Sequence, residues 1–330
     1  MYHHGVNSRR QVLYDTLREN LGEYQKPVEL CKMIGCDRKE FEKILSSIVN
    51  ICPYVTTNPL LGVRLDSVPE KLVDMEISHQ LSTSMFGKFI YVLDQVTSTN
   101  DVAVKLALSN PPGMLVVAEF QSRGRGRRGH TWQADGGASL LFSILLPEIY
   151  PPIPVGLSTM LIAGTMAKAL TVHCGVEIRI KWPNDLVVMA KGSKIEKLGG
   201  VLCEIHSVGT IAGIGINVNQ ESFPNDLPKA TSIRMQADKF FNRNTLLNKI
   251  LHQLELDFKD AASNNNSKIV TMMRNLSVTI GNQVTISTET GTVRGMAIDL
   301  LADGSLLVED DDHNRHRLLS GDITSTTNST

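Results

Sequence analysis

The sequence is poor in cysteine and has no segment that reads as an export signal. Its 330 residues include five cysteines, an odd number at scattered positions, and no two of them form a C-x-x-C pair. This pattern argues against a disulfide framework and against a structural zinc site, and it favours reduced thiols. The N-terminal segment MYHHGVNSRRQVLYD lacks the apolar core of a signal peptide. We therefore expect a cytoplasmic protein.

A strong net charge and a long unbroken apolar run are also missing. The formal net charge is −1, so whole-chain electrostatics gives no reason to expect non-specific binding to nucleic acid. The most apolar stretch is interrupted by Thr165, Lys168 and Thr171 and ends at Gly175. It therefore predicts a buried helix rather than a membrane span, and we expect no membrane partner.

The first 66 residues have the pattern of a small helical head. Gly35 ends one apolar-periodic segment, and Asp37 with Glu40 three residues later forms a capping box for the next helix. Two short helices separated by a glycine turn are typical of a helix-turn-helix, and the two β-like runs in CPYVTTNPLLGVRL are typical of a wing. We predict a winged helix-turn-helix domain over residues 1–66 and a linker helix over 67–87.

The remainder predicts a central body followed by a small β-barrel. KFIYVLDQV, GMLVVAEF, SLLFSILL and EIRIKWPNDLVVM are strand-like, and KLGGVLCEIHSVGTIAGIGINVN reads as a hairpin. We place a mixed-sheet domain over residues 88–272. The row of short strands that follows, with glycine and aspartate turns, predicts an SH3-like β-barrel over residues 273–325. The predicted fold class is therefore α+β.

The segment GRGRRG, from Gly124 to Gly129, has the glycine spacing of a dinucleotide-binding turn. That turn needs a following helix to hold the pyrophosphate, whereas the next residues predict a loop and a strand, so we reject this interpretation. The guanidinium groups of Arg125 and Arg127 suit carboxylate and phosphate, and the glycines let the backbone fold over such a ligand. The alternative is a flexible basic loop with no ligand. Trp132, just beyond, either covers a ligand ring or plugs the core.

A second group of polar residues lies in KWPND, which starts at Lys181, and at Lys197 before LGG. Asn184 and Asp185 stand at a strand end beside a proline, where polar groups face a cleft, although Asn-Asp turns are common between strands. Two glycines in an apolar strand indicate close approach of a ligand or of another backbone. Lys197 is therefore placed to neutralise a phosphate.

A third group, Ser98, Thr99 and Asn100, begins a helix after a strand, and its alternative is simple N-capping. Together, QSRGRGRRG, KWPND, the lysine before LGGVL, STND and GIGINVN resemble the motifs of biotin protein ligases. The terminal LLSGDIT resembles the end of that family's small β-barrel, and the resemblance covers Phe89 to Ser325. The helical head resembles that of the bifunctional class, in which ligase and biotin-operon repressor share one chain.

The resemblance implies a two-step reaction. The carboxylate of biotin attacks the α-phosphorus of ATP to give biotinyl-5′-adenylate and pyrophosphate, and a lysine of a biotin carboxyl carrier domain then displaces AMP. Two anions meet in the first step, so positive charge must be preorganised around them, with Mg²⁺ on the phosphates. Two alternatives remain open: a lipoate–protein ligase, which shares the central body, and a sensor that binds biotinyl-adenylate without transferring it.

The same resemblance assigns the residues of the site. The implied catalytic charges are Lys197, Arg125 and Arg127. The residues implied to bind biotin are Ser98, Thr99, Asn100, Gln121, Gly124, Arg125, Gly126, Arg127, Lys197 and Gly200. The residues implied to bind ATP are Arg127, Trp132, Lys181, Asn184, Asp185 and Asn217, with Asp185 also at the Mg²⁺.

This sequence departs from the family pattern in two places. Extra residues, including Lys191 and Lys194, lengthen the loop before Lys197. In the head, residues 1–66 carry nine Lys and Arg against eight Asp and Glu, a net of +1, which is a thin electrostatic footprint for operator DNA. We nevertheless expect DNA binding through Arg38, Lys39 and Lys43 of the second short helix, in a homodimer that pairs two weak heads.

Overall fold

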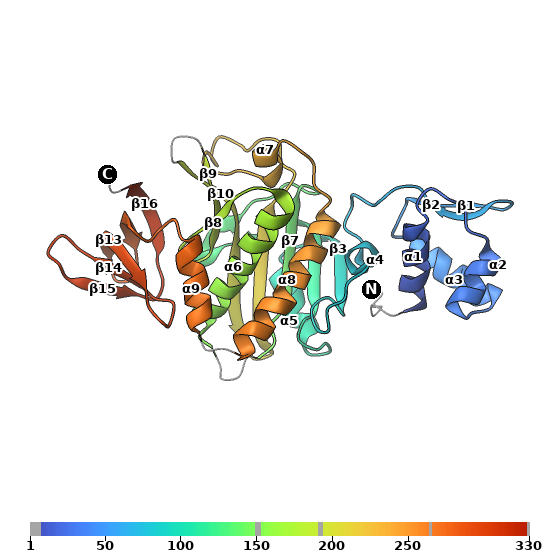
Figure 1. Cartoon of the computed structure of the whole chain (residues 1–330), viewed down its shortest axis with the longest axis horizontal. Coiled ribbons are helices and arrows are strands. Elements are labelled where there is room, and N and C mark those ends of the chain that lie inside the picture. Colours follow the sequence, from blue (N-terminus) through green and yellow to red (C-terminus); the bar gives the residue numbers. More distant parts are fainter. Residues whose placement is uncertain (1–7, 149–152, 191–193, 264–265, 329–330) are drawn as a thin grey trace.

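The computed structural model describes residues 8–148, 153–190, 194–263 and 266–328. Three parts follow one another along the long axis of the molecule (Figure 1). A helical head at the N-terminus is followed by a central sheet with packed helices and then by a small C-terminal sheet. The sequence therefore predicted the order and the general character of the three parts.

From residue 8 onward, the head has three helices and a hairpin: α1 (Arg9–Glu19), α2 (Pro27–Ile34), α3 (Arg38–Val49), β1 (Val55–Asn58) and β2 (Gly62–Leu65). The Asp37 side chain accepts a hydrogen bond from the Glu40 N–H at 2.8 Å, as predicted for the cap of α3. The other half of the predicted capping box is wrong, because the Glu40 carboxylate pairs with Arg9 instead. Leu13, Phe41 and other apolar side chains enclose a core of the head's own.

The predicted linker helix over 67–87 is much shorter than expected, since only α4 (Asp74–Ser78) forms. The backbone before it is bound by distant side chains: the Leu72 N–H donates to Glu119 at 2.7 Å and the Val73 N–H to Asn244 at 2.8 Å. These tertiary hydrogen bonds take the place of helical ones, so the segment stays extended. The head is held to α4 in turn by a buried ion pair between Arg10 and Asp74 at 2.7 Å.

Among the described residues, the central sheet has seven strands in the order β3-β4-β7-β11-β10-β9-β8. The strands are β3 (Ile90–Val96), β4 (Leu115–Gln121), β7 (Ser139–Leu145), β8 (Ile178–Lys181), β9 (Asp185–Ala190), β10 (Lys194–His206) and β11 (Gly209–Asn217). β3 and β4 are parallel and joined through α5 (Thr99–Ala107), whereas the other pairs are antiparallel, so the predicted mixed sheet is confirmed. The strand-like segment EIRIKWPNDLVVM forms two strands, because the chain turns at Pro183 into the β8–β9 hairpin, and Asn184 stands beside the predicted strand end.

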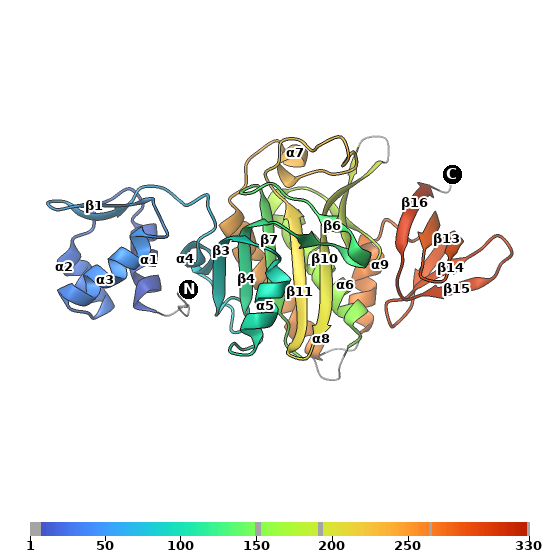
Figure 2. The same ribbon diagram turned by 180° about the vertical axis from the view of Figure 1, so that it is seen from behind.

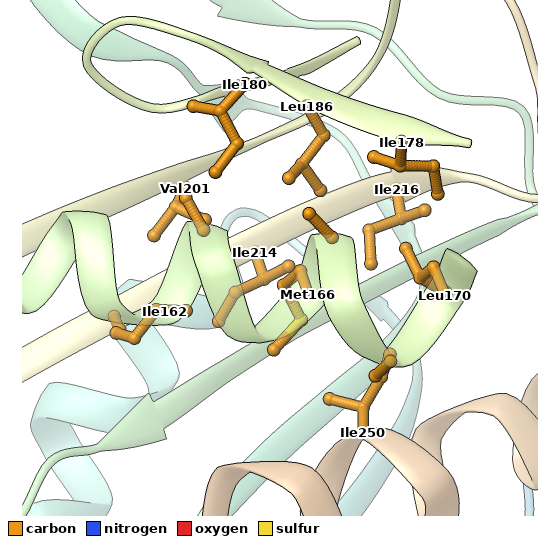
Figure 3. Close-up of a cluster of buried hydrophobic side chains, with 14 of the residues drawn as sticks. Ile162, Met166, Leu170, Ile178, Ile180, Leu186, Val201, Ile214, Ile216 and Ile250 are labelled. Atoms are coloured by element: carbon orange, nitrogen blue, oxygen red, sulfur yellow. The ribbon is translucent and has the colours of Figure 1, made fainter. Parts of the chain in front are cut away.

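Helices cover both faces of this sheet. α6 (Val155–Cys174), α8 (Arg243–Ser263) and α9 (Ser267–Leu276) lie on the face seen in Figure 1, while α5 lies on the opposite face, and α7 (Ile233–Ala237) stands at one edge (Figure 2). α6 is long and apolar enough to cross a membrane, but 67% of its apolar window is buried inside the protein. Figure 3 shows Met166 of α6 beside Ile214 of β11 and Ile250 of α8, so α6 is the core helix that the sequence predicted.

The C-terminal part is an antiparallel sheet with the strand order β15-β14-β13-β12-β16. Its strands are β12 (Asn282–Ser287), β13 (Thr292–Leu300), β14 (Leu306–Glu309), β15 (Arg315–Leu318) and β16 (Asp322–Asn328). The Trp182 indole N–H donates to the Gly304 carbonyl at 3.3 Å, which anchors this sheet to the β8–β9 turn. The predicted boundary at 272/273 falls inside α9, so the structural division comes after Leu276.

Candidate functional site

A pocket of about 310 Å³ lies where β4 ends, beside the start of α5 and the β8–β9 turn. Residues of β10, of β11 and of the beginning of β16 also line it. The predicted site residues that line it are Ser98, Thr99, Asn100, Gln121, Arg125, Gly126, Arg127, Trp132, Lys181, Asn184, Asp185, Lys197 and Gly200. The structure thus brings together three motifs that are widely separated along the chain.

The GRGRRG segment forms a small hairpin at the pocket mouth. β5 (Gly124–Arg125) pairs with β6 (Thr131–Trp132), and a single 3₁₀ turn over Arg127–Gly129 connects them. A strand rather than a helix follows Gly129, so the rejection of a dinucleotide turn is confirmed. Gly124 does not line the pocket, contrary to the prediction. Its role is steric, because a Cβ there would lie 2.6 Å from the Trp132 carbonyl oxygen.

The arginines of this loop have different partners. Arg125 pairs with Asp101 at 2.8 Å and with Glu204 at 3.3 Å, and the hydrogen bond to Asp101 raises its pKa. Arg127 donates to the Asn184 side chain at 3.2 Å and to the Gly321 carbonyl at 3.3 Å. Burial lowers the pKa of Arg127, as expected for a cation moved away from water. Arg127 therefore fastens the loop to both the central body and the C-terminal sheet.

The polar residues at the start of α5 are buried on the pocket floor. Ser98 stands at the N-cap position but makes no capping hydrogen bond through its side chain, so the simple capping alternative is wrong for it. The Thr99 N–H donates instead to the Gln121 side chain at 2.7 Å. Ser143 of β7 donates to the Asn100 side-chain oxygen at 2.5 Å. Any side chain larger than hydrogen at Gly213 would overlap Asn100, which explains one glycine of GIGINVN.

Lys197 faces the pocket from an irregular point in β10. Its Nζ lies 2.6 Å from Asp185 Oδ1, and its side chain is 44% exposed, which leaves the ammonium accessible to a ligand. The register shifts between Lys197 and Gly199. A Cβ on Gly199 would lie 2.6 Å from the Gly215 carbonyl oxygen, so the first glycine of LGG permits close approach of another backbone. Gly200, the second glycine of LGG, lines the pocket.

The side chains of Lys181 and Asn184 both donate hydrogen bonds to backbone carbonyls of the protein. Lys181 Nζ donates to the Ile323 carbonyl at 2.8 Å, and burial lowers the pKa of this lysine. Asn184 donates to the Val201 carbonyl at 2.6 Å. Both side chains therefore shape the pocket wall at the junction of β9, β10 and β16.

Asn217 lies outside the pocket lining, so its predicted place beside the nucleotide is not supported. Its buried side chain donates to the Thr231 carbonyl at 3.1 Å, and the Thr231 N–H donates to the Lys197 carbonyl at 2.9 Å. Asn217 thus supports the backbone that carries Lys197. The orientation of the Asn217 carboxamide is set by its hydrogen bond to the loop at Thr231. The motif GIGINVN alone does not specify that orientation.

Trp132 forms part of the pocket wall rather than a plug in the core. Its indole packs so closely on Gly215 that a Cβ there would lie 2.7 Å from the ring. Lys197 Nζ lies 5.9 Å from the ring centroid. The indole N–H is buried and has no hydrogen-bond partner within the described part of the chain.

Several residues that the sequence analysis missed belong to this site. Gly321, Asp322 and Ile323, from the motif LLSGDIT, line the pocket. Glu204 accepts a hydrogen bond from Asn100 at 2.5 Å and also faces Arg125. Gly321, Asp322 and Ile323 reach the pocket because the C-terminal sheet docks there, and Glu204 reaches Asn100 and Arg125 because side chains alternate between the two faces of β10. The motif LLSGDIT was the only signal in the sequence for any of them.

Of the described residues, Lys194, Arg38, Lys39 and Lys43 do not line the pocket. Lys194 begins β10 and is exposed, whereas Lys191 lies outside the described residues. Arg38, Lys39 and Lys43 are exposed on α3. Arg38 pairs with Glu42 at 2.7 Å, so its charge is compensated within the helix. The structure gives Lys39 and Lys43 no carboxylate within 4.0 Å among the residues that it describes.

Comparison with known proteins finds family matches to the central body and to the C-terminal sheet, both of which line this pocket. The Biotin/lipoate A/B protein ligase family matches residues 92–221, and the Biotin protein ligase C terminal domain matches residues 279–324. The chain is 29% identical over 311 residues to the bifunctional ligase/repressor BirA of Bacillus subtilis, covering 91% of this chain and 94% of that protein. It is 31% identical over 229 residues to the biotin--[acetyl-CoA-carboxylase] ligase of Mycobacterium tuberculosis, covering 66% and 82%. The structure is similar to that of biotin protein ligase from Aquifex aeolicus in complex with biotin and ATP, with a TM-score of 0.62, 26% identity, and coverage of 73% and 99%.

Proposed function

This chain belongs to the biotin protein ligase family, and we propose that it uses ATP to attach biotin to a lysine of a biotin carboxyl carrier domain. The observation that carries the proposal is the convergence of three polar groups on one pocket. Buried hydroxyl and amide groups form its floor, cations enter from two sides, and a tryptophan forms a wall. A cytoplasmic location, where ATP and carrier domains meet, is part of this proposal.

The biotin ureido ring is assigned to the floor of the pocket. A ureido group has one acceptor oxygen and two N–H donors, so it needs partners of both kinds. Ser98, Thr99, Asn100 and Gln121 supply hydroxyl and carboxamide groups that donate and accept. The first three are each less than 5% exposed in the absence of ligand, so few rotamers remain to be ordered when biotin binds.

Formation of the adenylate is assigned to Lys197, Arg127 and Arg125. The biotin carboxylate oxygen attacks the α-phosphorus of ATP, the bond to the bridging oxygen breaks, and pyrophosphate leaves. Negative charge grows on the phosphoryl oxygens in the transition state, so fixed cations in a partly dry pocket stabilise it most. Lys197 has an exposed ammonium and a neighbouring carboxylate that holds it in place.

Mg²⁺ is the metal expected with ATP, and the donors present fit it. Mg²⁺ commonly binds one or two carboxylates together with substrate phosphates. Asp185 and Asp322 both line the pocket. Clusters of three or more metal-ligating side chains are absent from the described residues, which agrees with a metal that arrives with the nucleotide. We assign its protein contact to Asp185, where it would neutralise phosphate charge.

The loop and the C-terminal sheet are proposed to enclose the adenylate. Biotinyl-5′-adenylate is a mixed anhydride that water destroys, so the pocket must exclude water until the carrier lysine attacks. Arg127 bridges the loop to Gly321, at the start of β16. No nucleophile of the chain is needed, since the acceptor amine belongs to the carrier domain and AMP is the leaving group.

The decisive experiment combines the purified protein with biotin, ATP, Mg²⁺ and a biotin carrier domain. Transfer of biotin to one carrier lysine supports the proposal. Exchange of pyrophosphate into ATP that depends on lipoate instead of biotin would favour the lipoate–protein ligase alternative. Adenylate that forms and stays bound without transfer would favour the sensor alternative.

A second function is proposed for the head, which we interpret as a winged helix-turn-helix over residues 1–66. The C-terminal sheet is interpreted as the SH3-like barrel. Lys39 and Lys43 are exposed on one face of α3, and the B. subtilis relative is named a ligase and a repressor. We propose that a ligand-dependent homodimer binds operator DNA through α3. Gel-shift assays on DNA upstream of the organism's biotin-synthesis genes test this.

A further inference from the structure

Two of the five cysteines meet at the turn between α2 and α3. Gly35 has a left-handed backbone conformation, with φ 63°. Its N–H donates to the Lys32 carbonyl at 3.3 Å, and the Cys36 N–H donates to the Cys31 carbonyl at 3.1 Å. This pair of hydrogen bonds defines a Schellman motif.

A Schellman motif brings two particular side chains together. One belongs to the residue whose carbonyl accepts the longer-range bond, and the other to the residue after the left-handed glycine. Cys31 and Cys36 occupy these two positions, so the motif places their side chains next to each other. Both cysteines also pack against the apolar core of the head. The fold of the cap therefore holds the two sulfur atoms side by side before any oxidation takes place.

The two thiols are accessible as well as adjacent. Cys31 and Cys36 are partly exposed, whereas Cys52 and Cys174 are buried. Burial raises the pKa of the Cys36 thiol, and the neighbouring Cys31 raises it further. The raised pKa lowers the thiolate fraction of Cys36 at neutral pH, so we expect this thiol to react slowly.

We propose that Cys31 and Cys36 form a reversible disulfide across the turn before α3, which makes the head an oxidation-sensitive modification site. The oxidant is hydrogen peroxide. One thiolate attacks the O–O bond and becomes a sulfenic acid while the peroxide releases hydroxide. The second thiolate then attacks that sulfur and displaces the oxygen as hydroxide. The two sulfurs lose two electrons, the peroxide gains them, and two molecules of water form overall. A dithiol reductant reverses the reaction.

The Cys31–Cys36 disulfide would link covalently the two sides of the α2–α3 turn, which backbone hydrogen bonds already close. Cys36 directly precedes Asp37, which caps α3 through the Glu40 N–H. Oxidation is therefore expected to preserve the head and to leave the distant ligase pocket unchanged. The proposal goes beyond the ligase function and does not depend on it.

The test uses the full chain treated with hydrogen peroxide, quenched with acid, and alkylated in denaturant. The oxidised chain should take up two fewer alkyl groups than the reduced chain, and dithiothreitol should restore both. Trypsin cleaves after Arg18, Lys32 and Arg38, so the disulfide should join peptide 19–32 to peptide 33–38. This linked pair identifies the two cysteines by mass without any substitution.

Cys36→Ser and Cys31→Ser are the matched variants. Each should lose the linked peptides and accumulate over-oxidised or intermolecularly linked product at the remaining cysteine, while carrier biotinylation stays at the wild-type rate. The proposal is overturned if both thiols of the wild-type chain remain alkylatable after prolonged oxidation. It is also overturned if peptide 19–32 or 33–38 is found only in disulfides with other partners.

Discussion

The ammonium of Lys197 lies 2.6 Å from the carboxylate of Asp185, across the paired strands β10 and β9. The two residues belong to different motifs, and the β-bulge after Lys197 brings them to the same side of the pocket. The carboxylate fixes the lysine in the absence of ligand, and phosphate competes for the same cation when ATP binds.

Lys197→Ala should reduce adenylate formation by about 10²–10³-fold, because it removes a preorganised charge that acts in the transition state. Biotin binding should change far less. Biotin-dependent pyrophosphate exchange measures the first quantity and titration calorimetry the second. Lys194→Ala and Lys191→Ala are the controls and should be mild. If Lys191 were the essential lysine, the correspondence drawn across the longer loop would be wrong.

Arg127→Gly should leave the fold intact but release the intermediate. The side chain joins the loop to Asn184 and Gly321, so its loss unfastens the cover over a reactive anhydride. Escaping adenylate would acylate lysines of any nearby protein, and mass spectrometry of a bystander protein should find scattered biotinylation. Arg123→Ala, at an exposed position of the same loop, should stay carrier-specific. An Arg127→Gly variant that biotinylates only the carrier domain would contradict the proposed clamp.

Arg243→Ala should destabilise the central body by about 3–5 kcal/mol, because it leaves the Glu119 carboxylate buried without its cation. The Arg243 and Glu119 side chains are 4% and 12% exposed and pair at 2.7 Å. Urea denaturation gives the free energy of unfolding. Lys71→Ala removes an exposed ion pair with Asp94 and should cost no more than about 1 kcal/mol. Equal losses in the two variants would disprove the buried-pair argument.

Glu255→Gln should weaken the acid sensitivity of the protein. Burial raises the pKa of Glu255, but hydrogen bonds from Ser84, Lys259 and the Phe86 N–H outweigh burial and lower it to about 2. A lowered folded-state pKa adds stability above the unfolded-state value near 4.5, and this stability is lost as the pH falls toward 2. The wild-type free energy of unfolding should therefore decrease more steeply than that of the variant over this range. Parallel curves would exclude Glu255 as a source of acid sensitivity.

The structure brings predicted site residues together where chemistry is concentrated in short motifs at the ends of strands. GRGRRG, KWPND and Lys197 converge because β4, β8, β9 and β10 bring those ends to one place. The sequence did not predict contacts that depend on docking between distant segments. Ile323 reaches Lys181 across 142 positions, and no local pattern encodes that approach.

Two predictions that the structure does not support have similar physical causes. The linker helix failed because Leu72 and Val73 donate to Glu119 and Asn244, and these tertiary bonds override local helix propensity. Asn217 was placed beside the nucleotide from its motif, yet its side chain is directed by the loop at Thr231. In both places a backbone or side-chain group had two available partners, and packing of distant segments decided between them.

Lys39→Glu should abolish any ligand-dependent binding of the head to operator DNA. Of the three predicted contacts on α3, Arg38 is already neutralised by Glu42, so Lys39 and Lys43 carry the electrostatic attraction. A head with a net charge of only +1 would bind weakly alone, and two heads in the proposed dimer would gain avidity on a palindromic site. The measurement is a gel shift with biotin and ATP, at low and at physiological salt. Arg38→Ala is the matched variant and should reduce binding less than Lys39→Glu does. A chain that biotinylates its carrier but shifts no DNA at either salt concentration would be a ligase whose head has lost repression.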